Sequence, residues 1–143
     1  MARKRLVIID GYSLLFRAFY GSRYLSTSAG RPTNALYGFV NMLFALFGEI
    51  KPDAVVVALD ETGQALTSAE FAGRIGKWRD GGTKDICFVI GGADGLDKAV
   101  LERAQLTLSF GRLTWPHLLV RVLLVEQIFR AQSILQGHPY HRE

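Results

Sequence analysis

The chain has 143 residues, of which 49% are hydrophobic, with a formal net charge of +4 at pH 7 and a pI of about 9.5. This length suggests one domain with a real core, no apolar run is long enough to cross a membrane, and the basic charge is compatible with nucleic-acid binding without establishing it. The single cysteine, Cys87, permits no internal disulfide and lies in an apolar strand pattern. We therefore expect a buried thiol and a cytoplasmic protein.

The first half of the chain predicts two strands and two helices. Ser13 is expected to cap the first helix, and Thr33 or Asn34 the second, which runs to about residue 50. The second helix is apolar around nearly its whole circumference, so we expect it to be covered on several sides. The two apolar runs that predict buried strands are residues 6–9, before Asp10, and residues 54–59, before Asp60.

The second half alternates helices and strands. Thr67 and Glu70 form a capping-box pattern, which predicts a helix from there to about Arg79. Strands that alternate with helices and read as continuous apolar runs are typical of a parallel α/β sheet with helices on both faces. The further expected elements are a strand over residues 86–90, a short helix over 96–104, a strand over 106–110 and a long helix over 118–136.

Three segments follow the carboxyl ends of the predicted strands, where parallel sheets bind their ligands. They are Leu59, the glycine-rich loop 91–95, and residues 110–115. Glycines let a ligand approach the main chain, and Leu and Trp side chains suit a flat heterocycle such as adenine. The glycine-rich loop matches neither a Walker loop nor a dinucleotide fingerprint, so a plain strand-to-helix turn is the competing interpretation of it.

Five motifs occur in a fixed order in the second half of the chain. They are residues 89–96 (VIGGADGL), 113–117 (LTWPH), 119–122 (LVRV), 126–131 (EQIFRA) and 138–142 (HPYHR). Together they resemble the large-subunit ribosomal RNA pseudouridine methyltransferase H family of the SPOUT superfamily, over roughly residues 54–143.

The resemblance implies S-adenosylmethionine as methyl donor, N3 of a pseudouridine in 23S rRNA as acceptor, a homodimer, and a SPOUT-like fold with a C-terminal trefoil knot. It implies donor contacts at one set of positions and a catalytic, RNA-facing role for the tail. The donor positions are Leu59, Gly91, Phe110, Gly111, Arg112, Leu113, Thr114 and Trp115, and the tail positions are Tyr140, His141 and Arg142.

The residues themselves are consistent with this chemistry. A basic side chain such as His141 could accept the N3 proton, and Arg142 could hold a phosphate or a base edge. For His117, a structural role after Pro116 competes with a catalytic one. The closing helix leaves only thin polar stripes, which favours a helix that contacts a second copy of the chain.

The first part of the chain carries the motifs 6–11 (LVIIDG), 15–20 (LFRAFY), 32–39 (PTNALYGF) and 51–53 (KPD), followed by a strand that ends at Asp60. On these motifs, residues 1–60 resemble a different family, the 5′ nuclease domain of bacterial DNA polymerase I. In that family the positions of Asp10 and Asp60 are metal-binding carboxylates, and those of Arg17 and Tyr20 lie close to the active site. The resemblance stops after Asp60, and two carboxylates alone make at best a weak cation site, so no metal is expected.

We interpret the chain as a chimera that forms a single α/β domain over residues 1–143. A nuclease-like segment (1–60) and a methyltransferase-like segment (54–143) would share the strand at residues 54–59. Two alternatives stay open at this point. One is a folded chimera without catalytic activity, and the other is the remnant of a metal-dependent 5′ nuclease.

Overall fold

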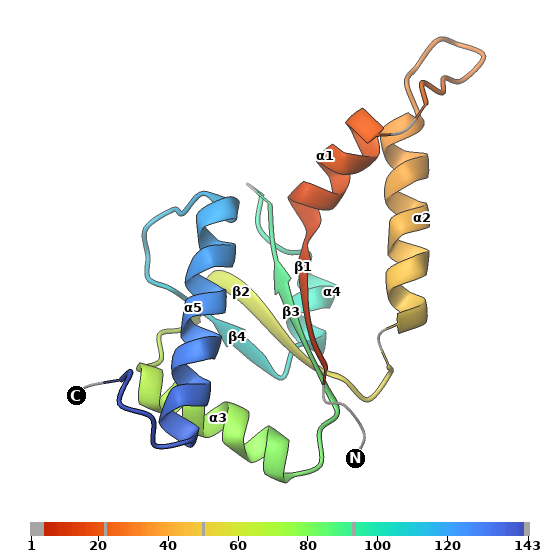
Figure 1. Ribbon diagram of the computed structural model, residues 1–143. Helices are drawn as coiled ribbons and strands as arrows, with labels where there is room; N and C mark the ends of the chain where they lie inside the picture. Colours follow the sequence, from red (N-terminus) through yellow and green to blue (C-terminus); the bar gives the residue numbers. More distant parts are fainter. Residues whose placement is uncertain (1–4, 22, 50, 93, 142–143) are drawn as a thin grey trace.

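The computed structural model describes residues 5–21, 23–49, 51–92 and 94–141, and the predicted site residue Arg142 lies outside them. These ranges hold four strands and five helices, which alternate along most of the chain (Figure 1). In chain order the elements are β1 (Arg5–Asp10), α1 (Gly11–Gly21), α2 (Asn34–Glu49), β2 (Val55–Gln64), α3 (Ser68–Asp80), β3 (Asp85–Ile90), α4 (Lys98–Arg103), β4 (Leu106–Leu108) and α5 (His117–Leu135).

All four strands run parallel in one sheet, in the order β1-β3-β2-β4. Strand β3 lies between β1 and β2, since Cys87 is opposite Val7 of β1 and Val56 of β2. The predicted parallel α/β sheet is therefore confirmed. The C-terminal trefoil knot stays a prediction.

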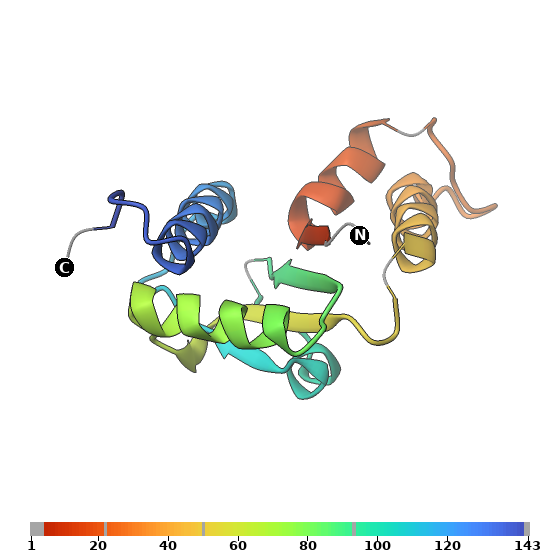
Figure 2. The ribbon, with the colours of Figure 1, turned by 60° about the horizontal axis from the view of Figure 1, so that its bottom comes forward.

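The core lies between the sheet and the helix pair α3–α5, and α4 lies on the opposite side of the sheet (Figure 2). Alternate strand residues such as Val57 and Phe88 face this pair and are completely buried. Leu124 of α5 meets them from the helix side and is also completely buried. This face of the sheet supplies most of the apolar burial that holds the molecule together.

Helices α1 and α2 form a hairpin that stands away from the sheet (Figure 1). They pack on each other, and the Asn34 side chain joins them by donating from Nδ2 to the Phe19 carbonyl oxygen at 2.8 Å. Leu36 and Tyr37 of α2 are exposed, with 65% and 62% of their surface accessible. The expectation that α2 is covered on several sides is therefore wrong for these two residues.

Several predicted element ends differ from the structure, and three of the differences have a local cause. Asp10 caps α1 instead of Ser13, since its Oδ1 accepts from the Ser13 amide at 3.0 Å and the helix begins at Gly11. Strand β2 continues past residue 59 to Gln64, which pairs with Leu108 of β4 after an irregularity. Strand β4 ends at Leu108 because the Ser109 hydroxyl accepts from the Gly111 amide at 3.1 Å and turns the chain.

The capping box at the start of α3 is confirmed, with the Thr67 side chain accepting from the Glu70 amide and the Glu70 side chain accepting from the Thr67 amide. Within the described ranges, no helix combines the length and the apolar character that a membrane crossing requires.

Candidate functional site

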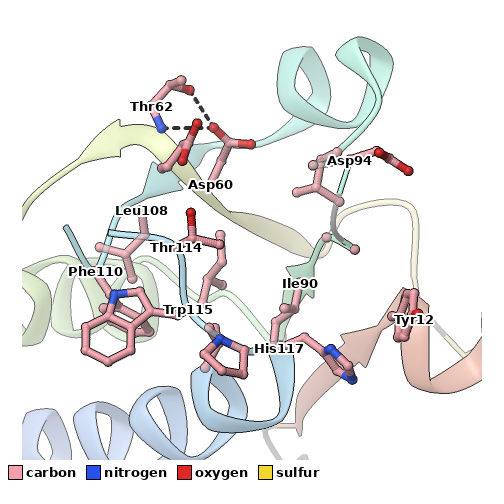
Figure 3. A pocket seen from close by; sticks show the side chains of 18 of the residues that line it. Tyr12, Asp60, Thr62, Ile90, Asp94, Leu108, Phe110, Thr114, Trp115 and His117 are labelled. Atoms are coloured by element: carbon pink, nitrogen blue, oxygen red, sulfur yellow. Dashed lines mark hydrogen bonds between the residues drawn. The ribbon is translucent and has the colours of Figure 1, made fainter. Parts of the chain in front are cut away.

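The carboxyl ends of β2, β3 and β4 open onto a cavity of about 980 Å³ (Figure 3). The parallel arrangement brings these three ends to one edge of the sheet, so segments far apart in sequence line the same space. Its apolar wall comes from Leu59, Ile90, Leu108, Phe110 and Trp115. This volume is at the upper end of the range for small-molecule sites.

Seven of the eight predicted donor-binding residues line this cavity. The eighth, Arg112, lines a neighbouring hollow of about 570 Å³ together with Glu61 and Ser109. The seven are Leu59, Gly91, Phe110, Gly111, Leu113, Thr114 and Trp115.

The loop after β3 is held in a tight turn that requires glycine. Gly92 and Gly95 face each other, with the Gly95 amide donating to the Gly92 carbonyl at 3.1 Å, and Gly95 has φ = 79°. A Cβ at Gly91 would lie 2.8 Å from the carbonyl carbon and oxygen of Gly95, closer than real Cβ atoms come. The main chain of this loop therefore borders the cavity directly, and any side chain at Gly91 would displace it.

Three acidic residues line the cavity, Asp60, Glu61 and Asp94. Asp60 lies within β2, and its Oδ1 accepts from the Thr62 amide at 2.9 Å and from the Thr62 hydroxyl at 2.6 Å. Asp94 lies on the loop after β3, across the cavity mouth from Trp115 (Figure 3). The sequence reasoning placed the loop 91–95, which contains Asp94, at this edge of the sheet, but it did not name Asp60 as a lining residue, although Asp60 follows the end of a predicted strand.

The buried Ser109 side chain holds the loop after β4 in place through hydrogen bonds. Its hydroxyl lies 3.2 Å from the Glu61 carbonyl oxygen and accepts from the Gly111 amide. This contact ties the loop of residues 110–115 to the end of β2. Two of the predicted donor-binding segments are thus fixed relative to each other.

The N-terminal segment also reaches the cavity. Tyr12, from the first turn of α1, lines it, and its ring centroid lies 4.8 Å from that of His117 at the start of α5. Asp10 is buried, accepts from the Ser13 hydroxyl at 2.7 Å, and lies 3.6 Å from Nε of Arg121. These contacts join the two halves of the chain at the cavity.

The two carboxylates at nuclease-type metal positions are both engaged in such contacts, Asp10 with Ser13 and Arg121, and Asp60 with Thr62. Among the residues that the structure describes, no three or more His, Cys, Asp or Glu side chains gather as a metal site would require.

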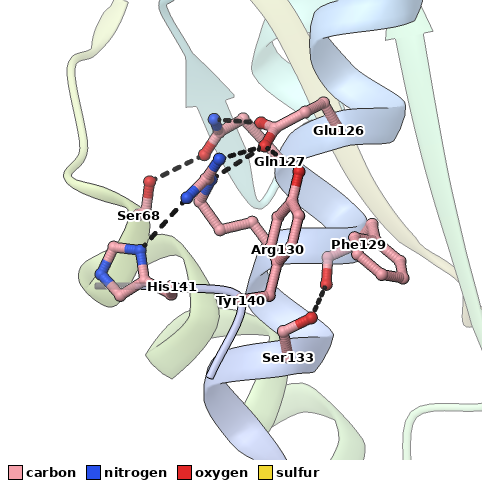
Figure 4. Close-up of polar contacts among 8 residues, drawn as sticks. All are labelled: Ser68, Glu126, Gln127, Phe129, Arg130, Ser133, Tyr140 and His141. Carbon is pink, nitrogen blue, oxygen red and sulfur yellow. Dashed lines mark hydrogen bonds and ion pairs between the residues drawn. The ribbon is translucent and has the colours of Figure 1, made fainter. Parts of the chain in front are cut away.

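The C-terminal tail folds back onto the second half of α5 (Figure 4). The Arg130 guanidinium donates to Oε1 of Glu126 at 2.9 Å, lies 4.9 Å from the centre of the Tyr140 ring, and approaches Nδ1 of His141 to 3.4 Å. The hydrogen bond to Glu126 raises the pKa of Arg130. The Tyr140 ring also packs edge-on against Phe129, with centroids 4.9 Å apart.

The structure does not bring the tail and the cavity together in one copy of the chain. Val120 of α5 lines the cavity, whereas Arg130 of the same helix holds the tail. An α-helix rises about 1.5 Å per residue, so these positions are roughly 15 Å apart along the axis. Tyr140 and His141 are therefore clustered with each other but separated from the predicted donor-binding residues.

Two family models match the chain. The model described as "Predicted SPOUT methyltransferase" matches residues 41–141, and that of the N-terminal resolvase-like domain of 5′-3′ exonucleases matches residues 5–72. The matches overlap over a segment that contains β2.

Ribosomal RNA large subunit methyltransferase H of Rhodospirillum centenum is 61% identical over 97 residues, which cover 68% of this chain and 64% of that protein. The protein of the same name from Rhizobium etli is 46% identical over 121 residues, covering 85% and 76%. The chain thus spans slightly less than two thirds of the length of the first of these relatives.

Among solved structures, Archaeoglobus fulgidus Nep1 bound to S-adenosylhomocysteine matches with a TM-score of 0.42 and 14% identity, over 78% of this chain and 55% of that one.

Proposed function

The chain belongs to the SPOUT methyltransferase family, and from that premise we propose that it binds S-adenosylmethionine in the cavity at the carboxyl edge of the sheet. The observation that carries the proposal is the convergence of Leu59, Gly91 and the loop 110–115 on this one cavity. These segments are distant in sequence, and the family resemblance marks all of them as donor contacts.

The residues present fit this donor. An adenine ring needs flat apolar walls, which Leu59, Phe110 and Trp115 provide, and main-chain groups at its edge, which the loop after β3 provides. Asp60 and Asp94 offer carboxylates to ribose hydroxyls and to the positively charged end of the donor. When bound, the donor supplies an electrophilic methyl group, and the chain aligns it with the acceptor nitrogen.

We propose that the acceptor is N3 of a pseudouridine in large-subunit ribosomal RNA, as the family resemblance implies. This acceptor would place the protein in the cytoplasm. His141 would accept the N3 proton, and Arg142 would contact the RNA, with Tyr140 beside them. Arg130 and Glu126 would hold the tail in a defined position for this role.

A homodimer would complete the site. Within one copy, the tail lies roughly 15 Å from the cavity along α5, so a second copy is needed to bring a tail to each cavity. The exposed apolar side chains of α5 offer a surface for it. They are Leu118, Leu119, Val122, Val125 and Phe129.

We further propose that the chain is a chimera that forms one α/β domain. Strand β1 from the nuclease-like segment pairs along its whole length with β3 from the methyltransferase-like segment. The Arg121–Asp10 contact and the His117–Tyr12 contact join the same two segments on the side of the cavity. The foreign strand thus occupies a regular position in the sheet.

Titration of the purified chain with S-adenosylmethionine by calorimetry tests the donor proposal. We expect saturable binding near one donor per chain, and Gly91→Ala should weaken it at least tenfold, because the added Cβ displaces the loop at Gly95. Gly73→Ala is the matched control, since a Cβ at this position of α3 meets nothing within 4 Å.

The outcomes separate the alternatives. A folded wild-type chain that binds no donor would overturn the proposal and favour a chimera without activity. Equal affinity for the wild type and Gly91→Ala would show that the donor binds elsewhere. A chain that binds the donor but does not methylate ribosomes would support the donor site and refute ribosomal RNA as the acceptor.

A further inference from the structure

We propose that Tyr12, which comes from the nuclease-like segment, is a donor-contacting residue that sets the affinity of the methyltransferase cavity. This inference rests on the proposed function, because it takes S-adenosylmethionine as the occupant. It goes beyond it by assigning a ligand-contacting role to a segment outside the methyltransferase-like part of the chain.

The ring of Tyr12 lies between two cavity-lining segments. A Cβ at Gly92 would stand 3.4 Å from Cδ2 of Tyr12, so the ring lies next to the loop after β3. The ring is also tilted against His117, at 4.8 Å between centroids. Tyr12 therefore closes the gap between the glycine-rich loop and the start of α5 (Figure 3).

The position of this ring is fixed by its neighbours in the chain. Asp10 is buried, caps α1 through Ser13, and faces Arg121, which lies one turn along α5 from His117. The first turn of α1 is thus held against the first turns of α5. Phe16, one turn further along α1, packs against the Tyr12 ring with centroids 4.7 Å apart.

Tyr12 lines the cavity and 36% of the residue is accessible, so part of its surface is open to a ligand there. An aromatic face suits both parts of this donor, because it packs against a flat purine and attracts a positively charged sulfonium. A ligand that fills this end of the cavity would meet the ring before it reached solvent. Loss of the ring would remove a wall and open the cavity to water.

The test compares the affinity for S-adenosylmethionine, by calorimetry, of the wild-type chain and three variants. Tyr12→Ala should raise Kd about fivefold, the loss expected for one aromatic contact. Tyr12→Phe keeps the ring and should restore Kd to within about twofold of the wild type. Tyr20→Ala is the matched control, because Tyr20 lies on the same helix, is 75% exposed and does not line the cavity.

Thermal melting of each variant shows whether the fold survives. If Tyr12→Ala does not fold, Tyr12→Leu replaces it, since leucine keeps much of the apolar volume without the aromatic face, and a several-fold rise in Kd is again expected. A wild-type chain that binds no donor would refute the proposed function itself. A wild-type chain that binds, with unchanged Kd in folded Tyr12→Ala or Tyr12→Leu, would refute only the role of Tyr12.

Discussion

Cys87 illustrates how burial sets the chemistry of a single residue. It is 2% exposed in β3, and desolvation raises the pKa of its thiol from 9.0 to about 11. This rise lowers the thiolate fraction at pH 8 about 100-fold. We expect Cys87 to react with a disulfide reagent at pH 8 at least about 100-fold more slowly in the native chain than in guanidinium chloride.

The same pKa shift makes the stability of the folded chain depend on pH. The folded chain holds the thiol proton more tightly than the unfolded chain, so this stabilisation is complete below pH 9.0 and is lost as the pH rises toward about 11. If Cys87 reacts with the disulfide reagent as fast in the native chain as in guanidinium chloride, β3 opens readily.

At the residue scale, the sequence could predict which side chains are buried but not which residues they contact. The apolar alternation around Cys87 indicated a buried thiol, which the structure confirms. The contact of Asp10 with Arg121 was not predicted, because it joins residues more than a hundred positions apart and depends on how the two halves pack. The contact of Tyr12 with His117 was missed for the same reason.

Among the helices, α3 carries a capping box that can be tested by itself. Thr67→Ala removes the side-chain acceptor for the Glu70 amide and should lower the free energy of unfolding by about 1 kcal/mol, as measured by urea denaturation. Ser28→Ala, in an exposed loop, is the control and should change it by less than about 0.5 kcal/mol.

The effect of Thr67→Ala should depend on pH. The Thr67 backbone amide and, after it, the Thr67 hydroxyl lower the pKa of Glu70 below 4.5. Thr67→Ala keeps the amide and removes the hydroxyl, which donates to Glu70 at 2.8 Å, so this part of its effect is present above pH 4.5 and is lost as the pH falls through the lowered value. An unchanged free energy of unfolding at pH 7 would show that the Thr67 side chain contributes nothing to the stability of the folded chain.

At the element scale, periodicity predicted the type and order of the strands and helices, but tertiary contacts set some of their ends. The apolar run of this strand ends at Leu59, yet β2 continues to Gln64 because Gln64 pairs with Leu108. Gly63 makes this possible, since a Cβ there would lie 2.7 Å from the carbonyl group of Thr107. A single sequence does not reveal such a close approach between two strands.

At the scale of the whole molecule, the cavity followed from topology and the tail did not. The rule that ligands bind at the carboxyl edge of a parallel sheet was enough to group Leu59, Gly91 and the loop 110–115. Nothing in the order of residues indicated that Tyr140 and His141 would fold back onto α5, because this depends on Arg130 and Glu126 reaching them in space.

If the proposed dimer forms through α5, methyl transfer should require the dimer, because the tail and the cavity are separated within one copy. Val122 is 64% exposed on this helix, and Val122→Glu would place a charge on its apolar surface. We expect a wild-type dimer to become a monomer by light scattering, with unchanged affinity for S-adenosylmethionine and loss of methyl transfer to ribosomes. The cavity lies within each copy, whereas the tail that serves it would come from the partner.

Leu36→Glu is the matched control, since Leu36 is 65% exposed on α2 and receives the same charge away from α5. It should leave the dimer and methyl transfer intact. A Val122→Glu chain that stays dimeric would show that α5 is not the interface. A monomeric Val122→Glu chain that still methylates would show that the tail leaves Arg130 and reaches the cavity of its own copy, across roughly 15 Å along α5.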